Sequence, residues 1–238
     1  MVPVVFIHGI RLSGAAWSEQ LGLLGHPAKA IDLPGHGSRR GERFTLDGAV
    51  DAVAGAIDEP ALVVGHSLGG YVATAAAARH PESVAGLVVA GSTYLPGKTL
   101  DVLFGLAHRL LTRLPDRGEG LSRRQFRTAL PPKLAEAVIG GGIATEVIPD
   151  VADALCRFDV LAVLATYPGP TWLINGSRDH FRRHERSFLD ACADGRLVTV
   201  PNAGHYLPMA RGREFAQLVL DAARVTGQGR HGVALVSA

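Results

Sequence analysis

The chain has 238 residues, of which 47% are hydrophobic and 19% charged, and its formal net charge is +2. This balance fits a compact globular protein with a substantial core and argues against extensive disorder. It also gives no global field of the kind that attracts nucleic acid, and no apolar run is long enough to span a membrane. The two cysteines, Cys156 and Cys192, match neither a disulfide framework nor a metal pattern.

The first half of the chain predicts strands that alternate with helices. Val4–Ile7 is a short, continuous apolar run, typical of a strand buried on both faces. Because this strand begins almost at once, without a basic segment or a cleavage site before it, we expect a cytoplasmic protein. Further strands are predicted at residues 28–33, 61–64 and 84–90, and helices at residues 15–24, 46–57 and 70–79.

The second half interrupts this alternation before resuming it. Residues 93–170 contain helical patterns at 100–114, 123–130 and 144–158 and no convincing strand, so they predict a helical cap over the carboxyl end of the sheet. Strands follow at 171–175 and 196–200, and a last helix at 212–225. The chain therefore divides into a core (1–92 and 171–226), the cap (93–170) and a C-terminal tail (227–238), which either is disordered or docks on the core. The alternation predicts a mostly parallel α/β sheet.

Residues 65–69 carry the strongest chemical signal. They read Gly-His-Ser-Leu-Gly and lie between a predicted strand and a predicted helix, which is the context that the G-x-S-x-G pattern requires. A sharp turn there would raise the Ser67 hydroxyl at a helix N-terminus, where orphan amides and the helix dipole favour a developing negative charge. The pattern predicts a nucleophilic serine.

A serine hydroxyl needs a base, and the base needs an orienting group. Asp179 follows the strand predicted at 171–175, and His205 follows the strand predicted at 196–200. The carboxyl ends of parallel strands share one edge of a sheet, so we expect Ser67, His205 and Asp179 to meet there, in the chain order of serine, acid and histidine.

Five motifs in this order resemble the α/β-hydrolase superfamily, specifically its small, capped, cofactor-free serine hydrolases. They are Phe6-Ile7-His8-Gly9, Asp32-Leu33-Pro34-Gly35-His36-Gly37, Gly65-His66-Ser67-Leu68-Gly69-Gly70, Gly176-Ser177-Arg178-Asp179 and Gly204-His205. The resemblance implies that Ser67 is the nucleophile, His205 the general base and acid, and Asp179 the residue that fixes the imidazole. It also implies an oxyanion hole from the Leu68 and Ile10 amides, and no metal or organic cofactor.

The chain departs from this family at its first strand. Family members usually carry two strands before the one that ends in His-Gly, whereas this chain opens with that strand, so we expect a sheet of about six strands. In some relatives the acid follows an earlier strand, and the corresponding residues here, Gly91-Ser92-Thr93, offer no carboxylate. This departure favours Asp179.

Other polar residues have a structural interpretation beside a chemical one. We expect His66 to pack beside the nucleophile, His8 and His36 to bond to backbone, and Asp32 to cap a turn. The i, i+4 spacing of His180 and His184 suits a metal on a helix, but a solvated helix start is the preferred interpretation. Trp17, Tyr94 and Tyr206 lie near the expected site, where each either packs or contacts substrate.

The cap combines arginines with an apolar side. The arginines either decorate a solvated surface or recognise an anionic group, such as a substrate carboxylate, a pantetheine phosphate or an acidic carrier protein. The apolar residues either line an acyl pocket or pack the cap on the core. The arginines are Arg109, Arg113, Arg117, Arg123, Arg124 and Arg127, and the apolar residues are Leu103, Phe104, Leu106, Leu110 and Leu111.

These features predict a serine hydrolase that cleaves a small-molecule carboxylic ester or thioester through an acyl-enzyme. Two alternatives remain open, since one fold hosts many chemistries. The same triad can serve a cofactor-free lyase or a carbon–carbon bond hydrolase, with Ser67 in a proton relay. A non-catalytic ligand receptor on this fold is the third interpretation.

Overall fold

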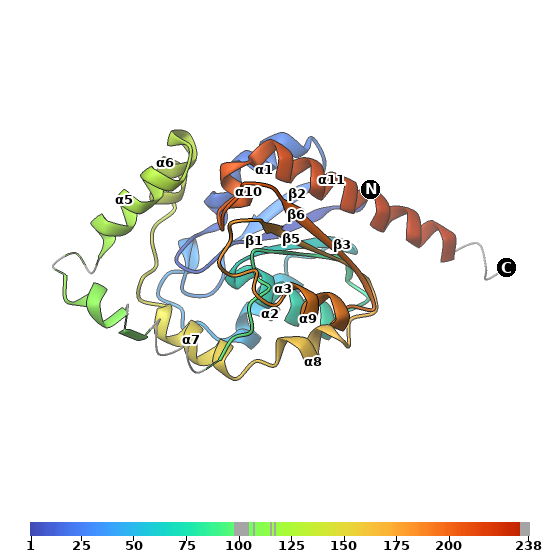
Figure 1. The fold of residues 1–238 in the computed structure, drawn as a ribbon, viewed down its shortest axis with the longest axis horizontal. Coiled ribbons are helices and arrows are strands. Elements are labelled where there is room, and N and C mark those ends of the chain that lie inside the picture. Colours follow the sequence, from blue (N-terminus) through green and yellow to red (C-terminus); the bar gives the residue numbers. More distant parts are fainter. Residues whose placement is uncertain (98–104, 107, 115, 117, 234–238) are drawn as a thin grey trace.

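The computed structural model describes residues 1–97, 105–106, 108–114, 116 and 118–233. Its centre is a six-stranded sheet in which every neighbouring pair is parallel, in the order β2-β1-β3-β4-β5-β6 (Figure 1). The strands are β1 (Val4–Ile7), β2 (Ala28–Ile31), β3 (Ala61–His66), β4 (Val84–Ala90), β5 (Pro170–Gly176) and β6 (Asp194–Val200). This sheet confirms the predicted fold class and the predicted number of strands.

Helices cover both faces of the sheet, because alternate strand residues point to opposite sides. Ile7, Val63 and Leu87 lie in one buried cluster with residues of the helices on that face, whereas Phe6, Leu62 and Val88 lie in another. The first face is covered by α2 (Leu46–Ala54), α3 (Leu68–Arg79), α8 (Val160–Leu164) and α9 (Glu185–Ala191). The second is covered by α1 (Ser18–Leu24) and α11 (Gly212–Val233), with short turns η1 (Gly14–Trp17), η2 (Gly37–Arg39) and α10 (Leu207–Ala210) in the connections.

Between β4 and β5 the described residues form helices and no strand. Helices α5 (Glu119–Ala129) and α6 (Pro132–Gly140) form a pair that stands to one side of the sheet in Figure 1, and helical turns occur at residues 105–106 and 108–112. The α5–α6 pair packs on Leu12, Ala16 and Met209 through a separate apolar cluster. Helix α7 (Ile148–Cys156) joins the main core instead, through Val151 and Leu155. The division into core, cap and tail at the stated boundaries remains a prediction.

Several helices differ from their predicted ranges. Helix α6 was not predicted, although Pro132 at its first turn and the apolar pairs Leu134–Ala135 and Val138–Ile139 are typical of an amphipathic helix. Helix α11 continues past residue 225 to Val233, because the segment contains no proline and each glycine costs a helix only about 1 kcal/mol. Within the described residues, none of the helices has both the length and the apolar character needed to cross a bilayer.

Candidate active site

Ser67 lies at a strained turn between β3 and α3. Its backbone has φ 54° and ψ −119°, a conformation that L-residues rarely adopt, and its amide donates to the carbonyl of Ala90 at 2.9 Å. The turn closes only because its flanking residues are glycines. A Cβ on Gly65 would overlap the carbonyl of Gly69, and a Cβ on Gly69 would overlap the carbonyl of Ile7. The close approach of these backbones therefore holds the Ser67 hydroxyl at the edge of the sheet.

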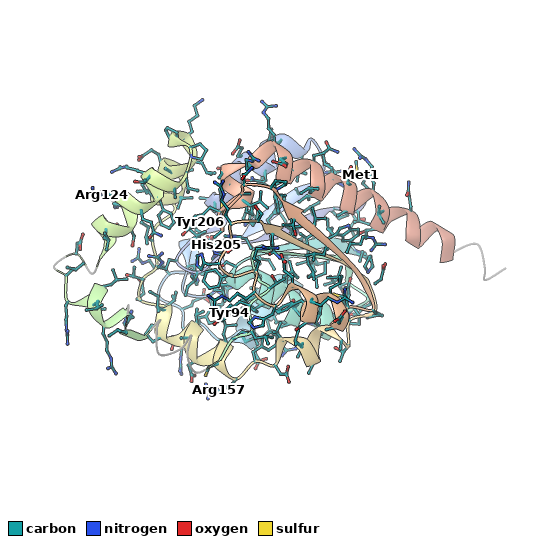
Figure 2. The ribbon with its side chains drawn as sticks, in the orientation of Figure 1. Met1, Tyr94, Arg124, Arg157, His205 and Tyr206 are labelled. Atoms are coloured by element: carbon teal, nitrogen blue, oxygen red, sulfur yellow. The ribbon has the colours of Figure 1, made fainter. Side chains whose placement is uncertain are left out.

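The structure brings the three predicted residues together at this edge. His205 Nε2 lies 3.2 Å from Ser67 Oγ, and His205 Nδ1 lies 3.0 Å from Asp179 Oδ2. The Asp179 side chain is only 1% exposed and the His205 side chain 13% exposed. Figure 2 shows His205 beside Tyr206, in the same part of the molecule as Tyr94. This arrangement can hold the imidazole with one nitrogen on the carboxylate and the other on the serine hydroxyl.

Asp179 is held in its ionised form by its neighbours. Burial opposes ionisation, but the hydrogen bond and charge of His205 and the amide of Phe181 together keep the pKa of this carboxyl below its usual range. The Phe181 amide donates to Asp179 Oδ1 at 2.9 Å. An ionised carboxylate can orient the imidazole and stabilise its protonated form.

Gly91, at the end of β4, makes room for the acid and the histidine. Its φ is 60°, and a Cβ there would lie 3.0 Å from Asp179 Oδ2 and 3.2 Å from His205 Nδ1. Sequence reasoning used this residue only to note a missing carboxylate. A glycine directly after a buried strand was the signal that could have identified it as part of the site.

Two residues that are expected to supply amides to an oxyanion lie beside Ser67. Ile10 and Leu68 line one small cavity together with Ser67. Leu68 is the first residue of α3, so its amide has no partner inside the helix. Neither amide donates a hydrogen bond to another group in the part of the chain that the structure describes. Both amides are therefore available to an oxygen bound beside Ser67, although their role in an oxyanion hole remains a prediction.

The cavity beside Ser67 is small, with a volume of ≈ 30 Å³, and has an apolar wall. Val151 and Leu155 come from α7, Phe181 from the loop after β5, and Tyr71 from α3. Sequence reasoning did not select any of these four residues, because they come from separate segments that only the fold brings together. The Tyr71 hydroxyl is engaged elsewhere, since it donates to the carbonyl of Tyr94 at 2.8 Å.

The residues suggested as substrate contacts differ in position. Trp17 is completely buried and stacks on Phe6 at 4.6 Å, which favours the packing interpretation over a contact with substrate. The Tyr206 ring lies 5.5 Å from the His205 ring, and the Tyr94 ring lies 6.0 Å from that of Phe181. Phe104 lies outside the described residues, as do Leu103 and Arg117.

The remaining polar residues make structural contacts. His66 is buried, and its Nε2 lies 2.9 Å from the carbonyl of His205, so it helps to position the backbone of His205. Asp32 accepts from the Gly14 amide and from Ser38, which is the turn role expected for it. His180 and His184 lie in turns before α9 and do not share a helix face; His184 Nδ1 accepts from the Leu95 amide.

Arg11 joins the loop after β1 to the cap. Its φ is 66°, unusual for a residue with a side chain, and it directly follows Ile10. Its Nη1 donates to Ser122 Oγ on α5 at 3.0 Å, and its guanidinium lies 5.8 Å from the centre of the Phe126 ring. Sequence reasoning missed this residue, and no local pattern marks it. Arg11 links the Ile10 loop to α5.

Comparisons with known proteins give one consistent result. A family model described as the alpha/beta hydrolase family matches residues 4–218. The chain is 30% identical over 217 residues to the pimeloyl-[acyl-carrier protein] methyl ester esterase of Neisseria meningitidis serogroup C, and the match covers 82% of each chain. The corresponding esterase of Sodalis glossinidius is 36% identical over 182 residues, which cover 66% of this chain and 71% of that one.

The structure also resembles solved hydrolases. It superposes on a thermophilic esterase from Thermogutta terrifontis with a TM-score of 0.78 at 22% identity, covering 95% of this chain and 90% of that chain. At this identity the likeness concerns the fold.

Proposed function

The chain belongs to the alpha/beta hydrolase family and is a hydrolase of the esterase class, and on that premise we propose that it cleaves a carboxylic ester or thioester through Ser67, His205 and Asp179. The observation that carries the proposal is the pair of contacts at His205, whose Nε2 lies 3.2 Å from Ser67 Oγ and whose Nδ1 lies 3.0 Å from Asp179. A base that is oriented by a buried carboxylate is what a serine nucleophile requires.

The reaction proceeds in two halves. Ser67 Oγ attacks the carbonyl carbon while His205 Nε2 takes its proton, and the oxyanion that forms accepts from the Ile10 and Leu68 amides. The bond to the leaving group then breaks, and His205 returns the proton to the departing oxygen or sulfur. Water, deprotonated by His205, attacks the acyl-serine in the same way and releases the acid together with free Ser67.

A covalent label tests this mechanism. A fluorophosphonate that phosphonylates active serines should modify the peptide that contains Ser67, as read by mass spectrometry, and Ser67→Ala should remove both the label and the hydrolysis of a panel of p-nitrophenyl esters. Ser177→Ala is a matched control, because Ser177 is an exposed serine in the loop after β5 that also carries Asp179. Unchanged hydrolysis in Ser67→Ala would reject the mechanism, and proton exchange without an acyl-serine would favour the lyase alternative.

We further propose that the acyl group is attached to an acidic carrier protein. Two findings support this. The relatives above are named as esterases of a substrate linked to an acyl-carrier protein. Helix α5 carries three arginines and one glutamate, so its net charge is positive. Of these arginines, Arg123 pairs with Glu119 and Arg127 with Glu136, all at exposed positions where a competing carboxylate can reach them.

Charge removal tests the carrier proposal separately from the chemistry. The triple variant Arg123→Ala, Arg124→Ala, Arg127→Ala should raise KM for an ester on an acyl-carrier protein by about tenfold or more at low salt, and should leave kcat/KM on a free methyl ester unchanged. Equal KM values for the carrier-linked ester in wild type and variant would reject it. A cytoplasmic location remains a prediction from the sequence, to be tested by cell fractionation.

A further inference from the structure

Arg11 is a half-buried cation whose charge has no carboxylate beside it in the part of the chain that the structure describes. Among the described residues five arginines are half-buried, and the other four each form an ion pair with a carboxylate; these four are Arg39, Arg123, Arg182 and Arg196. Arg11 contacts neutral groups instead, the Ser122 hydroxyl and the Phe126 ring. A guanidinium that gives up part of its hydration without gaining an anion is costly, so an anion from outside the chain would stabilise it.

The backbone of Arg11 is strained as well. Its φ of 66° lies in the left-handed region, which glycine adopts freely and a residue with a side chain does not. Strain of this kind is concentrated at sites that bind ligands, where it holds a side chain in place for the ligand. A strained backbone together with a charge that lacks a counter-charge indicates a binding role for this side chain.

Arg11 lies beside residues that carry the chemistry. It directly follows Ile10, which lines the small cavity together with Ser67. Its charge also acts on Tyr206, the neighbour of His205 in Figure 2. Burial raises the pKa of the Tyr206 hydroxyl, and the charge of Arg11 acts against this rise. Tyr206 therefore keeps its proton at neutral pH, so it does not neutralise Arg11 and can donate a hydrogen bond near it.

We propose that Arg11 and the Tyr206 hydroxyl bind a carboxylate of the substrate, near the carbonyl that Ser67 attacks. The N–H groups of a guanidinium form a planar fork that fits the two oxygens of a carboxylate, and Arg11 Nη1 alone donates to Ser122. The assignment rests on the proposed ester or thioester hydrolysis and adds the class of substrate, one that carries an ionised carboxylate. In a carrier-linked substrate this carboxylate belongs to the acyl chain.

Matched esters that differ by one charge test the site. We would measure kcat/KM by pH-stat near neutral pH for the methyl half-esters of succinic, glutaric and adipic acid, and for the neutral methyl esters of butanoic, pentanoic and hexanoic acid. The ratio within each pair reports the preference for the charged ester, and partial unfolding of a variant cancels in it. Arg11→Gly removes the guanidinium and suits the left-handed backbone, so it should lower the ratio for the best half-ester by about tenfold or more.

Four further variants separate the charge from the other contacts of Arg11. Arg11→Lys keeps the charge and should retain more of the ratio than Arg11→Gly. Tyr206→Phe removes one neutral donor and should lower the ratio by less than Arg11→Gly. Ser122→Ala removes the hydrogen bond to α5 and keeps the charge, so the ratio should stay close to the wild-type value. Arg213→Gln removes one positive charge at an exposed position of α11 and should leave the ratio unchanged.

A second pair of esters identifies the part of the substrate that carries the carboxylate. Carboxymethyl hexanoate has the charge in its alcohol part, and ethyl hexanoate is its neutral counterpart. A loss in Arg11→Gly that is confined to the half-esters assigns the carboxylate to the acyl part. A loss confined to carboxymethyl hexanoate assigns it to the alcohol part.

Unchanged ratios in Arg11→Gly for both kinds of ester would overturn the carboxylate site while leaving ester hydrolysis intact. An equal loss in Arg213→Gln would overturn it too, because the preference would then reflect the net charge of the protein. Absence of hydrolysis of every ester, together with no labelling of Ser67, would instead reject the proposed function, and the carboxylate site with it.

Discussion

Close contacts between backbone atoms determine the structure at the edge of the sheet around Ser67, whereas contacts between side chains determine how the cap packs. At the edge, Gly65 and Gly69 let main chain approach within distances that a Cβ would prevent, and Gly91 leaves room for Asp179 and His205. In the cap, α5 and α6 rest on an apolar cluster, and ion pairs such as Arg127–Glu136 lie at the exposed surface. Small substitutions at the edge should therefore reduce activity or stability much more than similar substitutions in the cap.

The largest contrast is expected between two aspartates. Asp179→Asn should lower kcat by about 10⁴-fold, because the amide can no longer hold the imidazole in the tautomer that accepts the Ser67 proton. Asp153→Asn, on α7, removes an exposed ion pair with Arg157 and should leave kcat unchanged. Steady-state kinetics on a methyl ester measures both. A loss below tenfold in Asp179→Asn would mean that another group orients His205.

Alanine substitutions at two glycines, one at the edge and one in the cap, should have very different effects on the free energy of unfolding. Gly69→Ala places a methyl group against the carbonyls of Ile7 and His8, so the free energy of unfolding should fall by about 4 kcal/mol or more. Gly140→Ala at the end of α6 meets open space and should change it by no more than about 1 kcal/mol, toward greater stability. Urea titrations compare them. Similar losses in both variants would contradict the contrast between edge and cap.

The same contrast explains what could be read from the sequence. The buried strands appear as short apolar runs, and the residues at their carboxyl ends had to meet because parallel strands share an edge. Ser67, Asp179 and His205 could therefore be placed together before the structure was known. Trp17 is near these turns in sequence, but stacking on Phe6 and Phe215 puts it in the core.

Cap residues could not be placed in this way. The cavity wall forms only when α7 and the loop after β5 pack on the core, which brings together Val151, Leu155 and Phe181. Helical periodicity identifies the buried face of a helix but not the element that covers it. Arg11 has no motif of its own, because its contacts with Ser122 and Phe126 depend on where α5 lies. Long-range side-chain contacts, unlike backbone turns, leave no local signature.

The pH dependence of stability should reflect the buried histidines of the edge. Burial, with the charge of a neighbouring histidine, lowers the pKa of His8 and of His66 to about 3. The unfolded chain binds protons at these residues near pH 6.5, whereas the folded chain does not. Each histidine therefore contributes stability that is complete above pH 6.5 and falls by about 1.4 kcal/mol per pH unit as the pH drops toward 3.

Urea unfolding at pH 7.0 and pH 5.5 measures this slope. His66→Gln retains a donor for the His205 carbonyl and removes the titrating group, so its stability should fall less steeply than that of the wild type, by about 1 kcal/mol per pH unit. A wild type whose stability does not change between the two pH values would contradict the burial of neutral histidines.

The smallest effect concerns Arg11, the residue that links the edge to the cap. Arg11→Ala and Arg11→Gly both remove the hydrogen bond to Ser122 and the contact with Phe126. They differ in the backbone, because φ of 66° is strained for alanine and relaxed for glycine. The glycine variant should therefore be more stable than the alanine variant by about 1 kcal/mol in urea unfolding.

Ser122→Ala is the control, because it removes the same hydrogen bond from the cap side and leaves the backbone of residue 11 unchanged. It separates the contribution of the hydrogen bond from that of the backbone strain. If Arg11→Gly is less stable than Arg11→Ala, the backbone strain inferred from the positive φ of residue 11 is rejected.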